Sequence, residues 1–163
     1  MQNEFEKYYN YSLRYLTIRS RSEKEIRDYL KKKKVSPETI EKITSKLKEH
    51  NFINDEEFAK WWIGQRISFK QRAFKVIKIE LQQKGITSEI IEDQISIRQL
   101  ADKNQKQDLG MAQEIVQKKI SKYKNFPKQE IYQKLGRVLS QKGFNWDVIK
   151  QSIDEALKGE YNT

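Results

Sequence analysis

The chain has 163 residues, enough for one ordinary domain or a short array of small units with a buried core. It contains no cysteine, which excludes disulfides and thiolate metal sites, and its net charge of +10 favours an acidic or polyanionic partner. No apolar run approaches the ~18–20 residues that span a bilayer, and the charged, aromatic start MQNEFEKYYN does not resemble a signal peptide. We therefore expect a soluble, cytoplasmic protein.

Charged residues make up 34% of the chain, which has few glycines, two prolines and no alternating strand-like runs. This composition predicts an all-α fold. In chain order, apolar spacing and capping residues predict helices over 5–19, 22–33, 36–50, 55–68, 71–84, 87–99, 106–123, 128–142 and 145–158. The polar stretch 98–108 is expected to be either a soft joint or part of a continuous helix.

An eleven-residue phrase occurs three times in the chain. It reads LKKKKVSPETI from Leu30, LQQKGITSEII from Leu81 and LSQKGFNWDVI from Leu139. A phrase that recurs at the spacing between Leu30, Leu81 and Leu139 is typical of stacked supersecondary units. The function of such units usually comes from the surface that they present together. The phrase and its upstream helices predict three-helix repeats over 1–53, 54–99 and 100–163.

Each phrase has the chemistry of a helix end, a turn and a helix start. Gly85 and Gly143 stand where a left-handed residue ends a helix, and Lys34 occupies the same position in the first copy. A lysine in that conformation should cost about 1 kcal/mol relative to glycine. The following helices are predicted to begin at side-chain caps, which are Ser36, Thr87 and Asn145.

Windows without any Asp or Glu recur where the first helix of each repeat meets the second. Such a window can be a solvated linker, but its threefold recurrence favours a binding face, and a basic track would form if the repeats stack regularly. Phe69 lies inside the middle window and is the best aromatic candidate for a partner contact. The candidate partner-binding or DNA-binding residues are Arg14, Arg19, Arg21, Arg66, Phe69, Lys70, Arg72, Lys75, Lys78, Lys118, Lys119 and Lys122.

No pattern in the chain indicates chemistry. There is no phosphate loop, no pair of histidine ligands and no glycine-rich dinucleotide turn. The single histidine, His50, is expected to cap the end of a helix. We therefore expect no enzyme activity, no catalytic residues, no metal and no cofactor.

Three stretches resemble motifs of the RecX family. YLTIRSRSEKEI, over 15–26, is similar to a helix end with Arg-x-x-Ser-x-x-Glu-Leu, and FINDEEFA, over 52–59, is similar to Phe-x-Asp-Asp-x-x-Phe-Ala with Asn54 for the first Asp. The third motif combines an arginine, a basic linker and ELQQKGI, over 80–86, but the linker has Phe69-Lys70-Gln71 where the family tends to have a glycine. The C-terminal repeat matches most weakly.

The resemblance covers essentially the whole chain, and it implies three tandem three-helix repeats in a curved, elongated array. It also implies a monomeric regulator of RecA in DNA repair, homologous recombination and the SOS response. Such a protein binds in the groove of the RecA–DNA filament, inhibits strand exchange, ATPase and coprotease activity, and binds single- and double-stranded DNA.

Two other functions remain open at the level of sequence. One is a helical DNA- or RNA-binding module that acts without RecA, and the other is a scaffold for a different acidic protein. Salt dependence separates the filament regulator from the nucleic-acid module in part, because phosphate binding weakens steeply with salt whereas apolar contacts to a filament do not.

Overall fold

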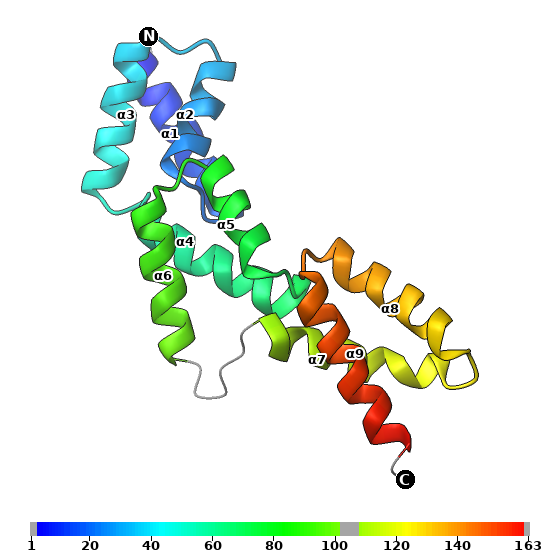
Figure 1. Ribbon diagram of the computed structural model, residues 1–163. Coiled ribbons are helices and arrows are strands. Elements are labelled where there is room, and N and C mark those ends of the chain that lie inside the picture. The colour runs from blue at the N-terminus through cyan, green and yellow to red at the C-terminus, as the bar shows by residue number, and fades with distance from the viewer. Residues whose placement is uncertain (1–2, 102–107, 162–163) are drawn as a thin grey trace. The chain divides into compact units, whose positions relative to one another are not determined.

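The computed structural model describes residues 3–101 and 108–161, and all regular structure in these ranges is helical (Figure 1). This confirms the predicted all-α fold. The helices are α1 (Glu4–Ile18), α2 (Glu23–Lys32), α3 (Pro37–Glu49), α4 (Asp55–Gln65), the π-helical turn η1 (Arg66–Lys70), α5 (Phe74–Gln83), α6 (Ser88–Ala101), α7 (Asp108–Ile120), the 3-10 turn η2 (Ser121–Tyr123), α8 (Lys128–Gln141) and α9 (Trp146–Tyr161). Residues 102–107 of the expected joint lie outside the described residues.

The chain divides into two compact units. Unit one comprises Met1–Gly64 and Ile79–Ile95, and unit two comprises Gln65–Lys78 and Ser96–Thr163. Helices α4, α5 and α6 contribute residues to both units. The repeat boundaries expected from sequence stay a prediction.

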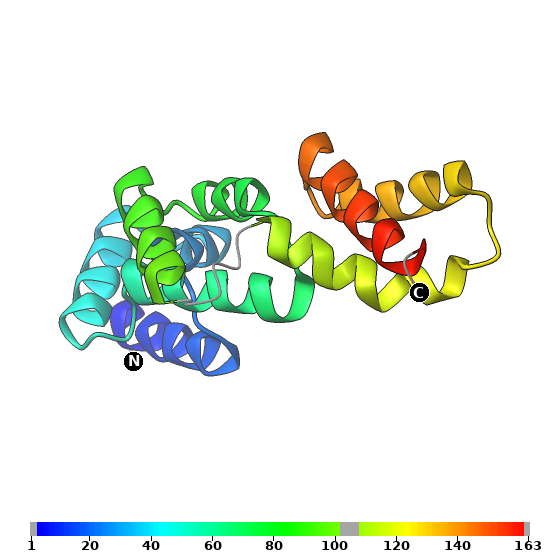
Figure 2. The same cartoon turned by 60° about the horizontal axis from the view of Figure 1, so that its bottom comes forward.

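Helices α1, α2 and α3 pack together in unit one (Figures 1 and 2). Their apolar faces bury a cluster that includes Ile26, Leu30, Ile43 and Leu47, all with no exposed area. The ring of Tyr15 stacks on Tyr29 with 4.3 Å between centroids, which extends the packing between α1 and α2. Burial of this apolar stripe is the main source of stability for such short helices.

Unit two has its own core between α7, α8 and α9 (Figure 2). It is formed by apolar residues at helical spacing on each element, which are Met111, Ala112, Ile115 and Val116 from α7, Ile131, Leu135 and Leu139 from α8, and Ile149 and Ile153 from α9. Helix α7 therefore presents its apolar stripe to both following helices.

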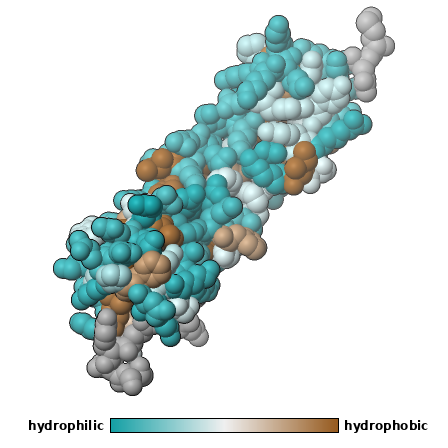
Figure 3. All heavy atoms as spheres, turned by 90° about the vertical axis from the view of Figure 1, so that its right-hand side faces the viewer, coloured by the Kyte–Doolittle hydropathy of each residue, from teal (hydrophilic) through white to brown (hydrophobic). Residues whose placement is uncertain are grey.

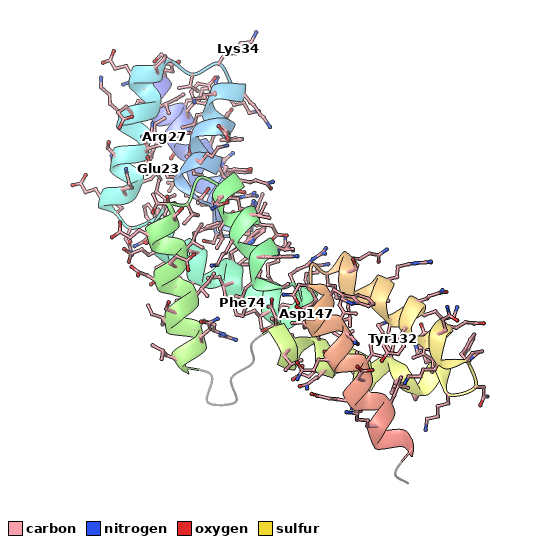
Figure 4. The ribbon with its side chains drawn as sticks, in the orientation of Figure 1. Glu23, Arg27, Lys34, Phe74, Tyr132 and Asp147 are labelled. Carbon is pink, nitrogen blue, oxygen red and sulfur yellow. The ribbon has the colours of Figure 1, made fainter. Side chains whose placement is uncertain are left out.

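The repeated phrase folds as predicted in all three copies. Lys34, Gly85 and Gly143 have φ angles of 60°, 78° and 91°, so each ends a helix in the left-handed region. The next helices begin at the predicted caps, where the side chains of Ser36, Thr87 and Asn145 accept backbone N–H groups. Lys34 lies at the tip of the turn between α2 and α3 (Figure 4). His50 is the C-terminal cap of α3, as expected.

The two glycine turns also seat against an earlier helix of the same unit. In unit one, a Cβ on Gly85 would lie 2.7 Å from the Cβ of Lys24 on α2. In unit two, a Cβ on Gly143 would overlap Cγ2 of Val76 on α5. Glycine is therefore required at both turns for space as well as for backbone conformation, whereas Lys34 is exposed and meets only the conformational cost.

The residue before each glycine completes this joint through its main-chain oxygen. In unit one, the Ser22 hydroxyl donates to the carbonyl oxygen of Lys84 over 2.7 Å. In unit two, the Ala73 N–H donates to the carbonyl oxygen of Lys142 over 3.1 Å. The Lys-Gly pair at 84–85 thus fixes the turn before α6 to the start of α2. The pair at 142–143 fixes the turn before α9 to the start of α5.

A half-buried aspartate also contributes to each of these joints. Asp55, at the start of α4, accepts the Glu23 N–H over 2.9 Å, and Asp108, at the start of α7, accepts the Phe74 N–H over 3.0 Å. Burial raises the pKa of both carboxyls, although the backbone hydrogen bond to each acts in the opposite direction. Asp55 thus caps the start of α2 and Asp108 caps the start of α5, and each also lies in the first turn of its own helix.

The main departure from prediction is the start of α5, which was expected at 71 and lies at Phe74. The α-helical part of α4 ends at Gln65, η1 follows, and Gln71 has a φ angle of 48°. The N–H groups of Arg72, Ala73 and Phe74 bond to Arg66, Lys142 and Asp108 instead of helical partners. Gln71 and Arg72 thus still bond to η1, while Ala73 and Phe74 bond to residues far away in sequence, which local sequence could not indicate.

Candidate functional site

The first basic window lies at the end of α1 and the start of α2, in unit one. Arg14 is exposed on α1, whereas Arg19 and Arg21 are half-buried in the connection. Of the three arginines predicted here, Arg14 is therefore exposed to solvent, whereas Arg19 and Arg21 pack against the fold.

Arg19 is held by a carboxylate. Its guanidinium donates to both oxygens of Glu25, at 2.6 and 3.2 Å, and lies 5.9 Å from the ring centroid of Trp62. Lys84 contacts the same carboxylate over 2.8 Å and the same ring at 4.4 Å. Burial would raise the pKa of Glu25, but hydrogen bonds from Arg19, Lys84 and the Ser22 N–H lower it to about 2. Arg19 thus stabilises unit one, and its charge is largely neutralised there.

Arg21 packs differently, with its guanidinium 3.9 Å from the ring centroid of Tyr15. Its Nε atom is buried and has no hydrogen-bond partner among the described residues. Cation–π stacking of this kind fixes the guanidinium plane while leaving its outer nitrogen atoms available for a partner.

The middle window forms η1 and the start of α5, in unit two. Phe69 is 76% exposed, which supports its selection as an aromatic contact residue. Lys70 and Lys75 are exposed, and Arg66, Arg72 and Lys78 are half-buried. The Arg72 side chain donates to the carbonyl oxygen of Gln141 over 2.8 Å.

Unit two brings a cation into this group that the sequence did not single out. Lys142, the C-cap of α8, donates from Nζ to the carbonyl oxygen of Lys70 over 2.8 Å. Desolvation lowers the pKa of Lys142, and the nearby charges of Arg72, Lys119 and Lys70 lower it further. Lys70, Arg72, Lys119 and Lys142 are called the cationic cluster below.

The third window lies at the end of α7. Lys118 and Lys119 occupy its last turn and Lys122 belongs to η2, with Lys118 and Lys122 exposed. Of these three, Lys119 is the one whose charge acts on Lys142. Lys119 of the third window and Lys70 and Arg72 of the middle window thus all act on the charge of Lys142 in unit two, while a single basic face stays a prediction.

No carboxylate among the described residues makes an ion pair with a member of the cationic cluster. Ion pairs are found in unit one, where Arg27 of α2 contacts Glu23 and Glu41. Figure 4 labels Glu23 and Arg27 on α2. One face of the molecule shows mainly hydrophilic side chains with separate apolar patches (Figure 3).

Over the ranges that the structure describes, no group of His, Asp and Glu side chains is placed to hold a metal ion. Within the same ranges, no helix combines the length and apolar character needed to cross a membrane.

Comparison with known proteins accounts for nearly all of the chain. Models of the first, second and third three-helix domains of RecX match residues 9–47, 54–93 and 105–153. A regulatory protein RecX from Clostridium perfringens is 33% identical over 98% of this chain and 73% of that protein. The chain belongs to the RecX family. The resemblance found in its motifs is thereby confirmed.

Other RecX relatives are longer than this chain. The regulatory protein RecX of Bacillus pumilus is 37% identical over 90% of the chain, and that of Bacillus subtilis is 31% identical over 94%. The chain spans about half the length of these relatives, 54% and 56% respectively.

Solved RecX structures have the same fold. A crystal structure of RecX from Lactobacillus salivarius matches with a TM-score of 0.75 and 27% identity, over 95% of this chain and 97% of the other. A second structure of a regulatory protein RecX matches with a TM-score of 0.71 and 26% identity, over 93% and 72% of the two chains.

Proposed function

We propose that the chain is a non-catalytic regulator of RecA that binds the RecA–DNA filament and inhibits strand exchange, ATPase and coprotease activity. Membership of the RecX family carries the proposal, because the relatives are named as regulatory proteins. The resemblance to that family implies the filament as partner. The protein acts in the cytoplasm as a monomer and also binds single- and double-stranded DNA.

The contact surface proposed for the filament is basic. Lys70, Lys75 and Lys118 are exposed, and Phe69 adds an exposed aromatic ring. Positive side chains can neutralise acidic protein surface or exposed phosphate and accelerate encounter with the filament. Three repeats that reach successive filament subunits would add several weak contacts as avidity.

A strand-exchange reaction with RecA and homologous DNA tests this function. The protein should slow the exchange when added after filament assembly. Its binding to the filament should retain a salt-resistant component, because apolar contacts accompany the charged ones. Unchanged strand exchange, together with salt-sensitive DNA binding in the absence of RecA, would instead favour the helical DNA- or RNA-binding module.

A further inference from the structure

The cationic cluster is assembled from three separate segments of unit two. Lys70 ends η1, Arg72 follows Gln71, Lys119 lies in the last turn of α7 and Lys142 caps α8. The joint around Gly143 brings Lys70, Arg72 and Lys142 together, because residues 70–73 meet residues 141–142 there through three hydrogen bonds of 2.8–3.1 Å. The charge of Lys119 acts on Lys142 from α7. The cluster is therefore a consequence of how two repeats stack within the unit, and not of a run of lysines in sequence.

Main-chain atoms hold two of the four cations in place. Lys142 donates to the Lys70 carbonyl oxygen and Arg72 donates to the Gln141 carbonyl oxygen. Each donor group uses one hydrogen-bonding position in this way and keeps others, since an ammonium has three donors and a guanidinium five. The side chains are thus ordered without a carboxylate from the described residues to neutralise them.

Such an arrangement is unfavourable in the absence of an anion. Arg72, Lys119 and Lys70 each oppose the charge of Lys142, whose ammonium is also partly desolvated. Elsewhere in the molecule several half-buried cations contact carboxylates, as with Arg19 and Lys84 on Glu25 and Arg27 on Glu23. Within the described residues the cationic cluster has no carboxylate partner, and its chemistry fits an anion with several acceptor oxygens.

We propose that the cationic cluster binds backbone phosphates of single-stranded nucleic acid and that Phe69 stacks on a base beside them. The inference rests on the DNA-binding part of the proposed function and is independent of RecA inhibition. Phe69 immediately precedes Lys70 and is 76% exposed, so an aromatic platform adjoins the phosphate site in sequence. Charge along the backbone together with base stacking is the general mode of single-strand recognition without sequence preference.

The test compares two variants of equal net charge by fluorescence anisotropy with a labelled oligo-dT, in the absence of RecA. The site variant is Lys119→Gln/Lys142→Gln, and the control is Lys150→Gln/Lys158→Gln, which changes two exposed lysines of α9 in the same unit. If both lysines contact phosphates, the site variant should bind at least tenfold more weakly than the parent. Its slope of log affinity against log salt should be less steep by about 1.4, while the control should stay close to the parent.

The variant Phe69→Ala tests the proposed stacking contact independently of the lysines. It should weaken oligo-dT binding about fivefold or more with an unchanged salt slope, and Phe69→Trp should restore binding. Helical circular dichroism and melting temperature should be retained in the site variant, because removing mutually repelling charges relieves the cluster.

The outcomes separate the site from the function. Equal weakening of the site and control variants would show that overall charge governs binding and would overturn the site. Preferential binding of a duplex of the same length would overturn single-strand recognition. A parent protein that binds no oligonucleotide would overturn both this site and the proposed DNA binding, whereas its effect on RecA would be judged separately by strand exchange.

Discussion

Glu25 organises the connection between α1 and α2. It accepts from Arg19, Lys84 and the Ser22 N–H, and its side chain is only 16% exposed. The Ser22–Glu25 capping box was predictable from residue spacing alone, because both partners lie within one helical turn. The contact with Lys84 was not predictable locally, because the two residues are 59 positions apart.

Replacing Glu25 with Gln should destabilise the protein by about 2 kcal/mol near neutral pH, since hydrogen bonds to charged groups are lost. The pKa of Glu25 is lowered from 4.5 to about 2, so its stabilisation is complete above pH 4.5 and is lost as pH falls towards 2. Urea unfolding at several pH values should show a constant difference from the parent above pH 4.5 that shrinks below it. A difference independent of pH would show that packing, and not charge, accounts for the loss.

Leu81 tests the interpretation of the repeated phrase as a core element. The side chain has no exposed area, and it occupies the first position of the second phrase. Leu81→Ala should lower the free energy of unfolding by roughly 2–5 kcal/mol because it leaves a cavity. Chemical denaturation measures this change, and a loss below about half a kcal/mol would contradict the burial of Leu81.

At the scale of the elements, helix ends were predictable where capping residues decide them. The three left-handed turns and their N-caps follow from residue type in the phrase itself. The start of α5 was misplaced because Ala73 bonds to Lys142, the C-cap of α8, and Phe74 bonds to Asp108 of α7. Lys142 escaped selection for the same reason, since its contact with Lys70 spans 72 positions. Its place in the repeated Lys-Gly pair was the available signal, but only the structure shows what that lysine contacts.

The turns at Lys34 and Gly85 should respond in opposite ways to substitution. Lys34→Gly should stabilise the protein by up to about 1 kcal/mol, because glycine relieves a left-handed residue that is exposed. Gly85→Ala should cost more than that amount, because the added Cβ meets Lys24 as well as adopting an unfavourable φ angle. Denaturation curves of the two variants measure both effects. Equal and small changes at both turns would contradict the joint between the turn and α2.

At the scale of the whole molecule, composition and repetition indicated a binding protein with no catalytic centre. The recurrence of acid-free windows pointed to the basic segments, but it could not distinguish neutralised cations from available ones. Arg19 is paired with Glu25, whereas Lys70 and Lys119 make no ion pair with the described residues. That distinction depends on which side chains the tertiary fold brings together.

The basic surface can be tested with exposed lysines, which avoids disturbing the hydrogen bond from Arg72 to Gln141. Lys70→Glu/Lys75→Glu should reduce inhibition of strand exchange at least tenfold, because both side chains are exposed on this surface. Lys70 follows Phe69 in sequence, and Lys75 lies at the start of α5. Lys150→Glu/Lys158→Glu makes the same change in net charge on α9 and should inhibit like the parent. Matched losses in the two variants, at unchanged helicity, would refute a specific basic surface.

Regulation of RecA is tested most directly by the ATPase activity of RecA on single-stranded DNA, titrated with this protein after the filaments have formed. A filament-binding inhibitor with contacts on several subunits should reduce the ATPase rate at fewer than one molecule per RecA subunit. Retention of the full rate at equimolar and higher concentrations, with the titrated protein shown to be folded, would contradict the proposed function.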